Sequence, residues 1–163
     1  MTATGDTGFE PATGDGPPLP AAGAAARAAA VATAHEGLLQ IRRLTNAEHP
    51  VPESVPAAWE LLRPVRAVAL ALEAAGVRPS AVDASGLRAS KGYLVGTGSA
   101  PGTVRVEWVG PAGSGAARDE EESLTRCATV LRGLGWTALL YRGPRRRRFL
   151  DVEPPSGLRR AGG

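Results

Sequence analysis

Apolar side chains first recur along the chain at the spacing of a helix. Between residues 21 and 45, positions three and four apart fall on one face: Val31, Ala34, Leu38, Ile41 and Leu44. The alanine-rich start of this segment adds high intrinsic helix propensity. A second run, residues 54–75, repeats the spacing and stops before Gly76. Pro64 lies inside it, where its ring and missing N–H predict a kink or break.

These two runs predict an antiparallel helical pair. The second helix is apolar around much of its circumference, which would suit a partner surface. The pair is expected either to cover the sheet described next or to mediate self-association.

After residue 91 the apolar period changes from that of a helix to that of a strand. Alternate apolar positions predict strands over residues 93–97 and 104–108, with Val104, Val106 and Trp108 on one face of the second strand. The glycine- and proline-containing segment 98–102 between them has the length of a hairpin turn. These strands therefore form a β-hairpin.

A third amphipathic segment, residues 118–134, follows a glycine-rich loop. Its apolar stripe comprises Leu124, Ala128, Leu131 and Leu134, and four acidic residues occupy its first turns, where the helix dipole favours negative charge. Two more strands are predicted over residues 136–141 and 149–152, with Gly143 and Pro144 at the turn between them. Residues 92–153 thus read as a β-β-α-β-β unit.

The predicted fold class is α+β, an N-terminal helical pair followed by the β-β-α-β-β unit with a mainly antiparallel four-stranded sheet. Residues 21–153 are expected to form a single domain, with 21–76 as the helical half and 92–153 as the sheet half. Residues 1–20 are rich in Thr, Gly, Asp and Pro and are expected to be a disordered tail. Residues 154–163 are expected to be a flexible tail.

Composition limits the core and suggests a source. Aromatic residues make up only 4% of the chain, so the core must consist mostly of Ala, Val and Leu. Eighteen of the nineteen basic residues are arginine, which is typical of a GC-rich bacterial genome and lowers the significance of the basic count. With no secretory signal and no long apolar segment, we expect a cytoplasmic protein without a membrane span.

Positive charge gathers near the C-terminus. Residues 142–163 carry seven arginines and two acidic residues, and five of these arginines surround the predicted last turn: Arg142, Arg145, Arg146, Arg147 and Arg148. Such a hairpin tip can grip phosphates or enter a nucleic-acid groove, with Trp136 and Tyr141 offering stacking surfaces. The alternatives are an acidic protein partner, anionic lipid, or a solvated charge run that protects an edge strand from aggregation.

Other chemistry finds little support in the sequence. His35 and His49 have no Cys or Asp at ligand spacing, so no metal site is predicted. The single cysteine, Cys127, is expected to be a small buried hydrophobe. The acidic run 119–122 is assigned to the helix dipole, with the arginine cluster of a second copy as its alternative contact. No catalytic residue or cofactor is assigned, and an enzyme is disfavoured.

The sequence therefore predicts a small non-catalytic binding or regulatory protein that contacts nucleic acid through its arginine-rich hairpin. The alternative is a protein-interaction or homodimerisation module, acting through the helical half and without a nucleic-acid role.

Overall fold

A computed structural model describes residues 9–156 of the chain. Its α-helices are α1 (Ala24–Thr45), α2 (Ala58–Leu62), α3 (Pro64–Ala74) and α4 (Ala116–Gly133). Its strands are β1 (Ala81–Val82), β2 (Arg88–Ser90), β3 (Gly92–Thr97), β4 (Val104–Val109), β5 (Thr137–Arg142) and β6 (Arg148–Glu153). Two short 3₁₀ helices, η2 (Pro52–Ser54) and η3 (Pro144–Arg146), complete the order. The α+β class and the β-β-α-β-β order are confirmed, as is the break before Pro64.

The four long strands form one antiparallel sheet in the order β3-β4-β6-β5. The β3–β4 and β5–β6 hairpins each pair over six residues, whereas β4 and β6 pair over only three, from Val104↔Val152 to Val106↔Leu150. The connector at 77–91, which showed no strand pattern, contains the small antiparallel sheet β1–β2. The two hairpins are therefore joined along a short seam.

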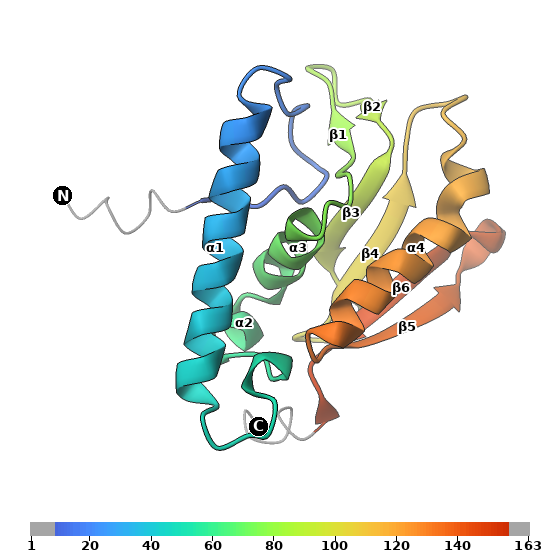
Figure 1. Cartoon of the computed structure of the whole chain (residues 1–163). Helices are drawn as coiled ribbons and strands as arrows, with labels where there is room; N and C mark the ends of the chain where they lie inside the picture. The colour runs from blue at the N-terminus through green and yellow to red at the C-terminus, as the bar shows by residue number, and fades with distance from the viewer. Residues whose placement is uncertain (1–8, 157–163) are drawn as a thin grey trace.

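The elements form three layers (Figure 1). Helices α3 and α4 lie on one face of the sheet, and α1 lies outside α3. Among the helices of residues 9–156, none is long and apolar enough to cross a bilayer. Within residues 9–156, no helix covers the opposite face of the sheet, so the strand residues that point away from α4 are at the surface of this part of the chain.

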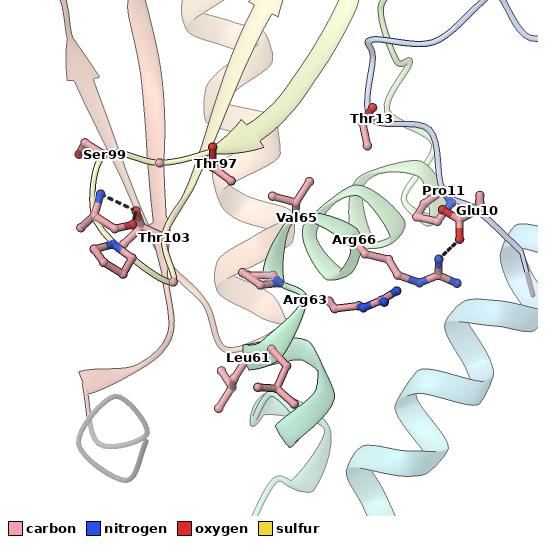
Figure 2. A pocket seen from close by; sticks show the side chains of 16 residues that line it. Glu10, Pro11, Thr13, Leu61, Arg63, Val65, Arg66, Thr97, Ser99 and Thr103 are labelled. Atoms are coloured by element: carbon pink, nitrogen blue, oxygen red, sulfur yellow. Dashed lines mark hydrogen bonds and ion pairs between the residues drawn. The ribbon is translucent and has the colours of Figure 1, made fainter. Parts of the chain in front are cut away.

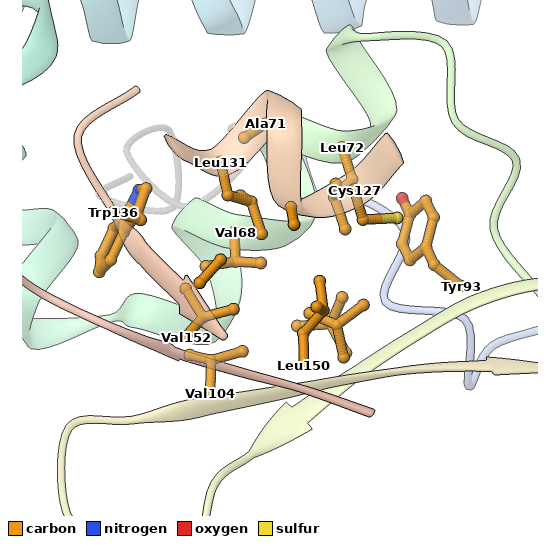
Figure 3. Close-up of a cluster of buried hydrophobic side chains, with 14 of the residues drawn as sticks. Val68, Ala71, Leu72, Tyr93, Val104, Cys127, Leu131, Trp136, Leu150 and Val152 are labelled. Atoms are coloured by element: carbon orange, nitrogen blue, oxygen red, sulfur yellow. The ribbon is translucent and has the colours of Figure 1, made fainter. Parts of the chain in front are cut away.

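The core lies between the sheet and the inner helices (Figure 3). Val104, Leu150 and Val152 from the strands meet Val68 of α3 and Leu131 of α4, all fully buried. The aliphatic residues of the predicted strand and helix faces supply most of this core, as the low aromatic content requires.

Helix α3 is buried on all sides, with residues 67–72 all inaccessible to solvent. It lies between α1 and the sheet, so its apolar circumference packs within the chain and is not free for a partner. The structure thus assigns this helix to the core of the domain.

Residues 9–16, part of the segment that we expected to be disordered, lie against the domain; residues 1–8 of it, and 157–163 of the C-terminal tail, lie outside the described residues. The Glu73 carboxylate accepts a bond from the Ala12 N–H at 2.8 Å, and the Tyr93 hydroxyl donates to the Ala12 carbonyl at 2.8 Å. Gly14 has φ +95°, and a Cβ there would stand 2.1 Å from the Tyr93 carbonyl oxygen. These contacts pin a polar segment that hydropathy alone marks as a tail.

A buried ion pair inside the helical half also contacts the sheet half through Arg42. Arg42 and Glu60 are both fully buried and form two hydrogen bonds, of 2.8 and 2.6 Å. The Arg42 guanidinium also donates at 2.6 Å to the carbonyls of Glu53, before α2, and Leu134, at the end of α4. Glu60 also accepts the Ala57 N–H at 2.8 Å. All charged groups of the pair are therefore satisfied.

This pair changes the inner face of α1. The face predicted from apolar spacing included Ile41 and Leu44, but these are 42% and 73% exposed. Arg42 occupies the buried position one turn after Leu38, because it alone reaches both Glu60 and the carbonyl at the end of α4.

Replacing one member of the pair should be costly, because the other is left as an unpaired buried charge. We expect Glu60→Ala to lower the free energy of unfolding by about 3–5 kcal/mol. The control is Glu36→Ala, which removes the exposed partner of Arg43 and should cost about 1 kcal/mol or less. Urea denaturation measures both, and equal effects of the two variants would contradict this assignment.

The stability of the fold should also depend on His35. Burial, and then the nearby Arg42 charge, lower the pKa of His35 below its ordinary value of about 6.5. The unfolded chain therefore binds a proton more readily, so stability present above about pH 6.5 is lost as the pH falls toward the folded-state pKa.

We expect His35→Gln to remove this part of the pH dependence and His49→Gln, at an exposed site, to retain it. Thermal denaturation between neutral and mildly acidic pH measures the effect. An unchanged profile in His35→Gln would show that the ring does not contribute.

Candidate nucleic-acid interface

The arginine cluster lies at the tip of the β5–β6 hairpin, beside the first turn of α4 (Figure 1). The strands end at the pair Arg142↔Arg148, and residues 143–147 form the turn. Arg145 and Arg146 have φ values of 59° and 62°, the left-handed conformation that costs an L-residue about 1–2 kcal/mol. Two consecutive arginines thus occupy positions that glycine or asparagine would fill more easily.

The structure divides the five predicted arginines into two groups. Arg148 is half-buried, 3.0 Å from Glu121 and 3.9 Å from Glu120. The other four, Arg142, Arg145, Arg146 and Arg147, are exposed, and their guanidinium groups have no hydrogen-bond or ion-pair partner within residues 9–156. Arg148 therefore holds the hairpin to α4, whereas the remaining four can meet an external anion.

An aromatic pair adjoins the tip on the open face of the sheet. Tyr141 and Phe149 are opposite each other on β5 and β6, with ring centroids 5.7 Å apart and planes at 26°. The Arg105 guanidinium lies 3.9 Å from the Phe149 ring centroid. Tyr141 is 46% exposed, so one of its ring faces is open to a ligand.

Trp136, expected to offer a second stacking surface, is only 3% exposed and belongs to the core. It precedes β5 and lies at one end of the core cluster (Figure 3). Phe149 takes the expected place beside Tyr141. The two predicted strands end at Tyr141 and begin at Phe149, so pairing them outward from the turn between them would have placed these rings opposite each other, a signal that sequence reasoning missed.

A recess opens where β4 and β6 stop pairing. We call it the β4–β6 recess; it has a volume of about 750 Å³. One wall is the arginine tip, and the others are the end of β4, the glycine-rich loop and the first turn of α4. Its chemistry comes from five arginines, two glutamates and one indole: Arg88, Arg145, Arg146, Arg147, Arg148, Glu107, Glu120 and Trp108.

The acidic run of α4 is largely neutralised within the chain. Asp119 pairs with Lys91, whose hydrogen bond lowers the pKa of Asp119. Glu120 and Glu121 meet Arg148. The contact between the acidic run and the arginine cluster, considered for a second copy, therefore occurs inside one chain.

The described residues include no cluster of metal ligands, and the thiol of Cys127 is not ionised. Burial raises the pKa of the Cys127 thiol to about 12, so it is protonated at neutral pH, in line with its predicted role as a buried hydrophobe. Within residues 9–156, no three His, Cys, Asp or Glu side chains gather as a metal site would require.

A second cavity, of about 820 Å³, lies on the other side of the domain (Figure 2). It is lined by the α2–α3 corner, including Leu61, Arg63 and Val65, by the β3–β4 turn, and by the Glu10–Arg66 ion pair. Its lining is mainly apolar, and none of the five predicted arginines reaches it.

Comparisons with known proteins found no match to this chain. The chain matches no family model, no curated protein and no solved structure. The candidate interface is therefore judged on its geometry.

The positive φ values of Arg145 and Arg146 predict backbone strain at the tip, which a glycine substitution can test. We expect Arg146→Gly to raise the free energy of unfolding by up to about 1 kcal/mol, because glycine adopts a positive φ without strain. Arg147→Gly is the matched control, since Arg147 has φ −74° and gains nothing from glycine. Urea denaturation measures both, and equal effects of the two variants would show that position 146 is not strained.

Proposed function

We propose that this protein binds single-stranded nucleic acid at the corner of the sheet formed by the β5–β6 tip. The observation that carries the proposal is the pairing of two features in one place. Arg145, Arg146 and Arg147 lack acidic partners in the described chain, and beside them an exposed Tyr141 stacks on Phe149.

Each feature has a distinct part in binding. Arginine forms bidentate, charge-assisted bonds to phosphate oxygens. An aromatic ring on an open sheet accepts an unstacked base with little regard to its identity. Because bases in a duplex are already stacked on each other, the open ring of Tyr141 favours a single strand.

The part of the open sheet face that can contact a nucleic-acid strand is short. Asp151 lies farther along the same open face, opposite Arg105 on β4, and Glu107 lies beside the tip itself. The negative charge of Asp151 disfavours a phosphate backbone there, which confines contacts to a few nucleotides near the tip. We also propose that the protein is cytoplasmic, as a nucleic-acid ligand favours, and bacterial, as its arginine-rich composition favours.

The alternative is a protein-interaction or homodimerisation module. Three large apolar residues near the outer end of the helical half favour it: Leu44 at 73%, Val51 at 56% and Leu62 at 82% exposure. An acidic protein could also meet the arginine tip. Sedimentation without nucleic acid, in the buffer used for binding, separates self-association from strand binding.

Fluorescence anisotropy with a labelled single-stranded oligonucleotide tests the main proposal. We expect the variant with Arg145, Arg146 and Arg147 all changed to Gln to bind much more weakly. Its slope of log affinity against log salt should flatten by about 2, since each lost phosphate contact on a single strand contributes about 0.7.

The matched control changes three exposed arginines elsewhere, Arg63, Arg78 and Arg126, to Gln, and so removes the same net charge. Equal loss in both variants would reduce the effect to overall charge and contradict a site at the tip.

The same assay tests the aromatic contribution. Tyr141→Ala should lose about 1–3 kcal/mol of affinity for the single strand, the usual contribution of one stacked base. Leu139→Ala, on the same strand and face and 43% exposed, should change little. If duplex binds as tightly as the single strand and Tyr141→Ala has no effect, stacking has no part in binding.

A further inference from the structure

The β4–β6 recess exists because a carboxylate interrupts the sheet. The β4–β6 register ends at Val106↔Leu150, and two further steps would bring Trp108 opposite Arg148. Instead, the Arg148 N–H donates to the Glu120 carboxylate of α4 at 2.7 Å. Glu120 is only 4% exposed, so it fills the position that the neighbouring strand would otherwise take. The strands separate there, and the tip arginines turn toward α4.

Hydrogen-bond donors converge on this recess. Arg145, Arg146 and Arg147 line it, and their side chains have no partner in the described part of the chain. Helix α4 begins there without a side-chain cap, and Ala116 and Ala117 of its first turn line the recess. The first N–H groups of a helix have no partner inside the helix and favour an anion.

An unpaired indole adds an independent observation. Trp108 also lines the recess; it is only 8% exposed, and its Nε1 has no hydrogen-bond partner within residues 9–156. Buried donors in proteins are nearly always paired. The tip arginines and the uncapped start of α4 thus border one recess, whose lining also includes Trp108, a residue with a buried and unpaired indole N–H.

The two glutamates in the lining do not neutralise the positive charge of the recess. Glu120 is compensated by the backbone N–H and guanidinium of Arg148. Glu107 is the other acid in the lining. Arg88 is held by the Gly14 carbonyl and by Asp15. Three arginines therefore remain for a ligand, more than a single negative charge requires.

We propose that the β4–β6 recess is a binding site for a phosphomonoester. Such a group carries nearly two negative charges and three strong acceptor oxygens, against one charge for a phosphodiester inside a strand. It matches the three uncommitted arginines and the uncapped start of α4. The same group occurs on a free nucleotide and at a phosphorylated strand end, and the latter source rests on the proposed function.

Calorimetric titration of the full chain tests the proposal, with AMP, adenosine, and three versions of one oligonucleotide as ligands. The oligonucleotides carry a 5′-phosphate, a 3′-phosphate or hydroxyls at both ends. We expect AMP to bind and adenosine to bind at least tenfold more weakly. We also expect one phosphorylated oligonucleotide to bind at least tenfold more tightly than the hydroxyl-ended one.

A variant that retains the fold sharpens this test. Ala117→Asp places a carboxylate in the recess at a helical position where the dipole favours an acid, so folding should be preserved. It should reduce AMP affinity at least tenfold. Thr125→Asp, farther along α4 and outside the recess lining, carries the same charge change and should bind AMP as the wild type does.

The outcomes separate the two proposals. If AMP and adenosine bind equally and no terminal phosphate improves oligonucleotide binding, the phosphomonoester site is refuted. The proposed strand binding then stands or falls with the hydroxyl-ended oligonucleotide alone. If AMP binds and Ala117→Asp abolishes it while no oligonucleotide binds, the recess takes a free nucleotide and the strand-binding function is refuted. Equal AMP binding by the Ala117→Asp and Thr125→Asp variants also overturns the assignment of the recess.

Discussion

Arg42 and Glu60 face each other in the interior of the helical half, and four segments of the chain meet at them. Arg42 comes from α1 and Glu60 from α2, while the carbonyls that Arg42 binds belong to η2 and to the end of α4. A charge pair in a protein interior is tolerated only when every donor and acceptor is satisfied. This requirement fixes where the helical half sits against the corner between α4 and β5.

The backbone is closely packed at this corner between α4 and β5. A Cβ at Gly135, whose φ is +89°, would stand 1.9 Å from the Ser54 carbonyl oxygen. The loop before α2 thus lies directly on the turn that leads into β5. With this corner fixed, α3 and α4 cover one face of the sheet and the other face stays open. The aromatic pair and Arg105 are accessible on that open face as a consequence.

A second carboxylate shapes the end of the sheet that carries the arginine tip. Glu120 lies where the pairing between β4 and β6 ends and holds Arg148, while the side chains of the turn arginines beyond it have no partner in the described chain. Arg145 and Arg146 hold the left-handed backbone conformation at this end of the sheet. Backbone strain of this kind tends to persist where function requires a particular side chain.

Local patterns in the sequence determined the elements of this protein. The apolar periods, Pro64 and the glycine turns located the helices and the long strands, because these depend on neighbours three or four residues away, or two. Charge counting also located the arginine cluster. Only the tertiary structure decided that Arg42 replaces Ile41 on the inner face of α1 and that Trp136 is buried. It also showed that Arg148 is committed to α4 and that a recess forms beside the tip. Each of these depends on contacts between residues far apart in sequence, such as Arg42 with Leu134 and Arg148 with Glu120, which no local period records.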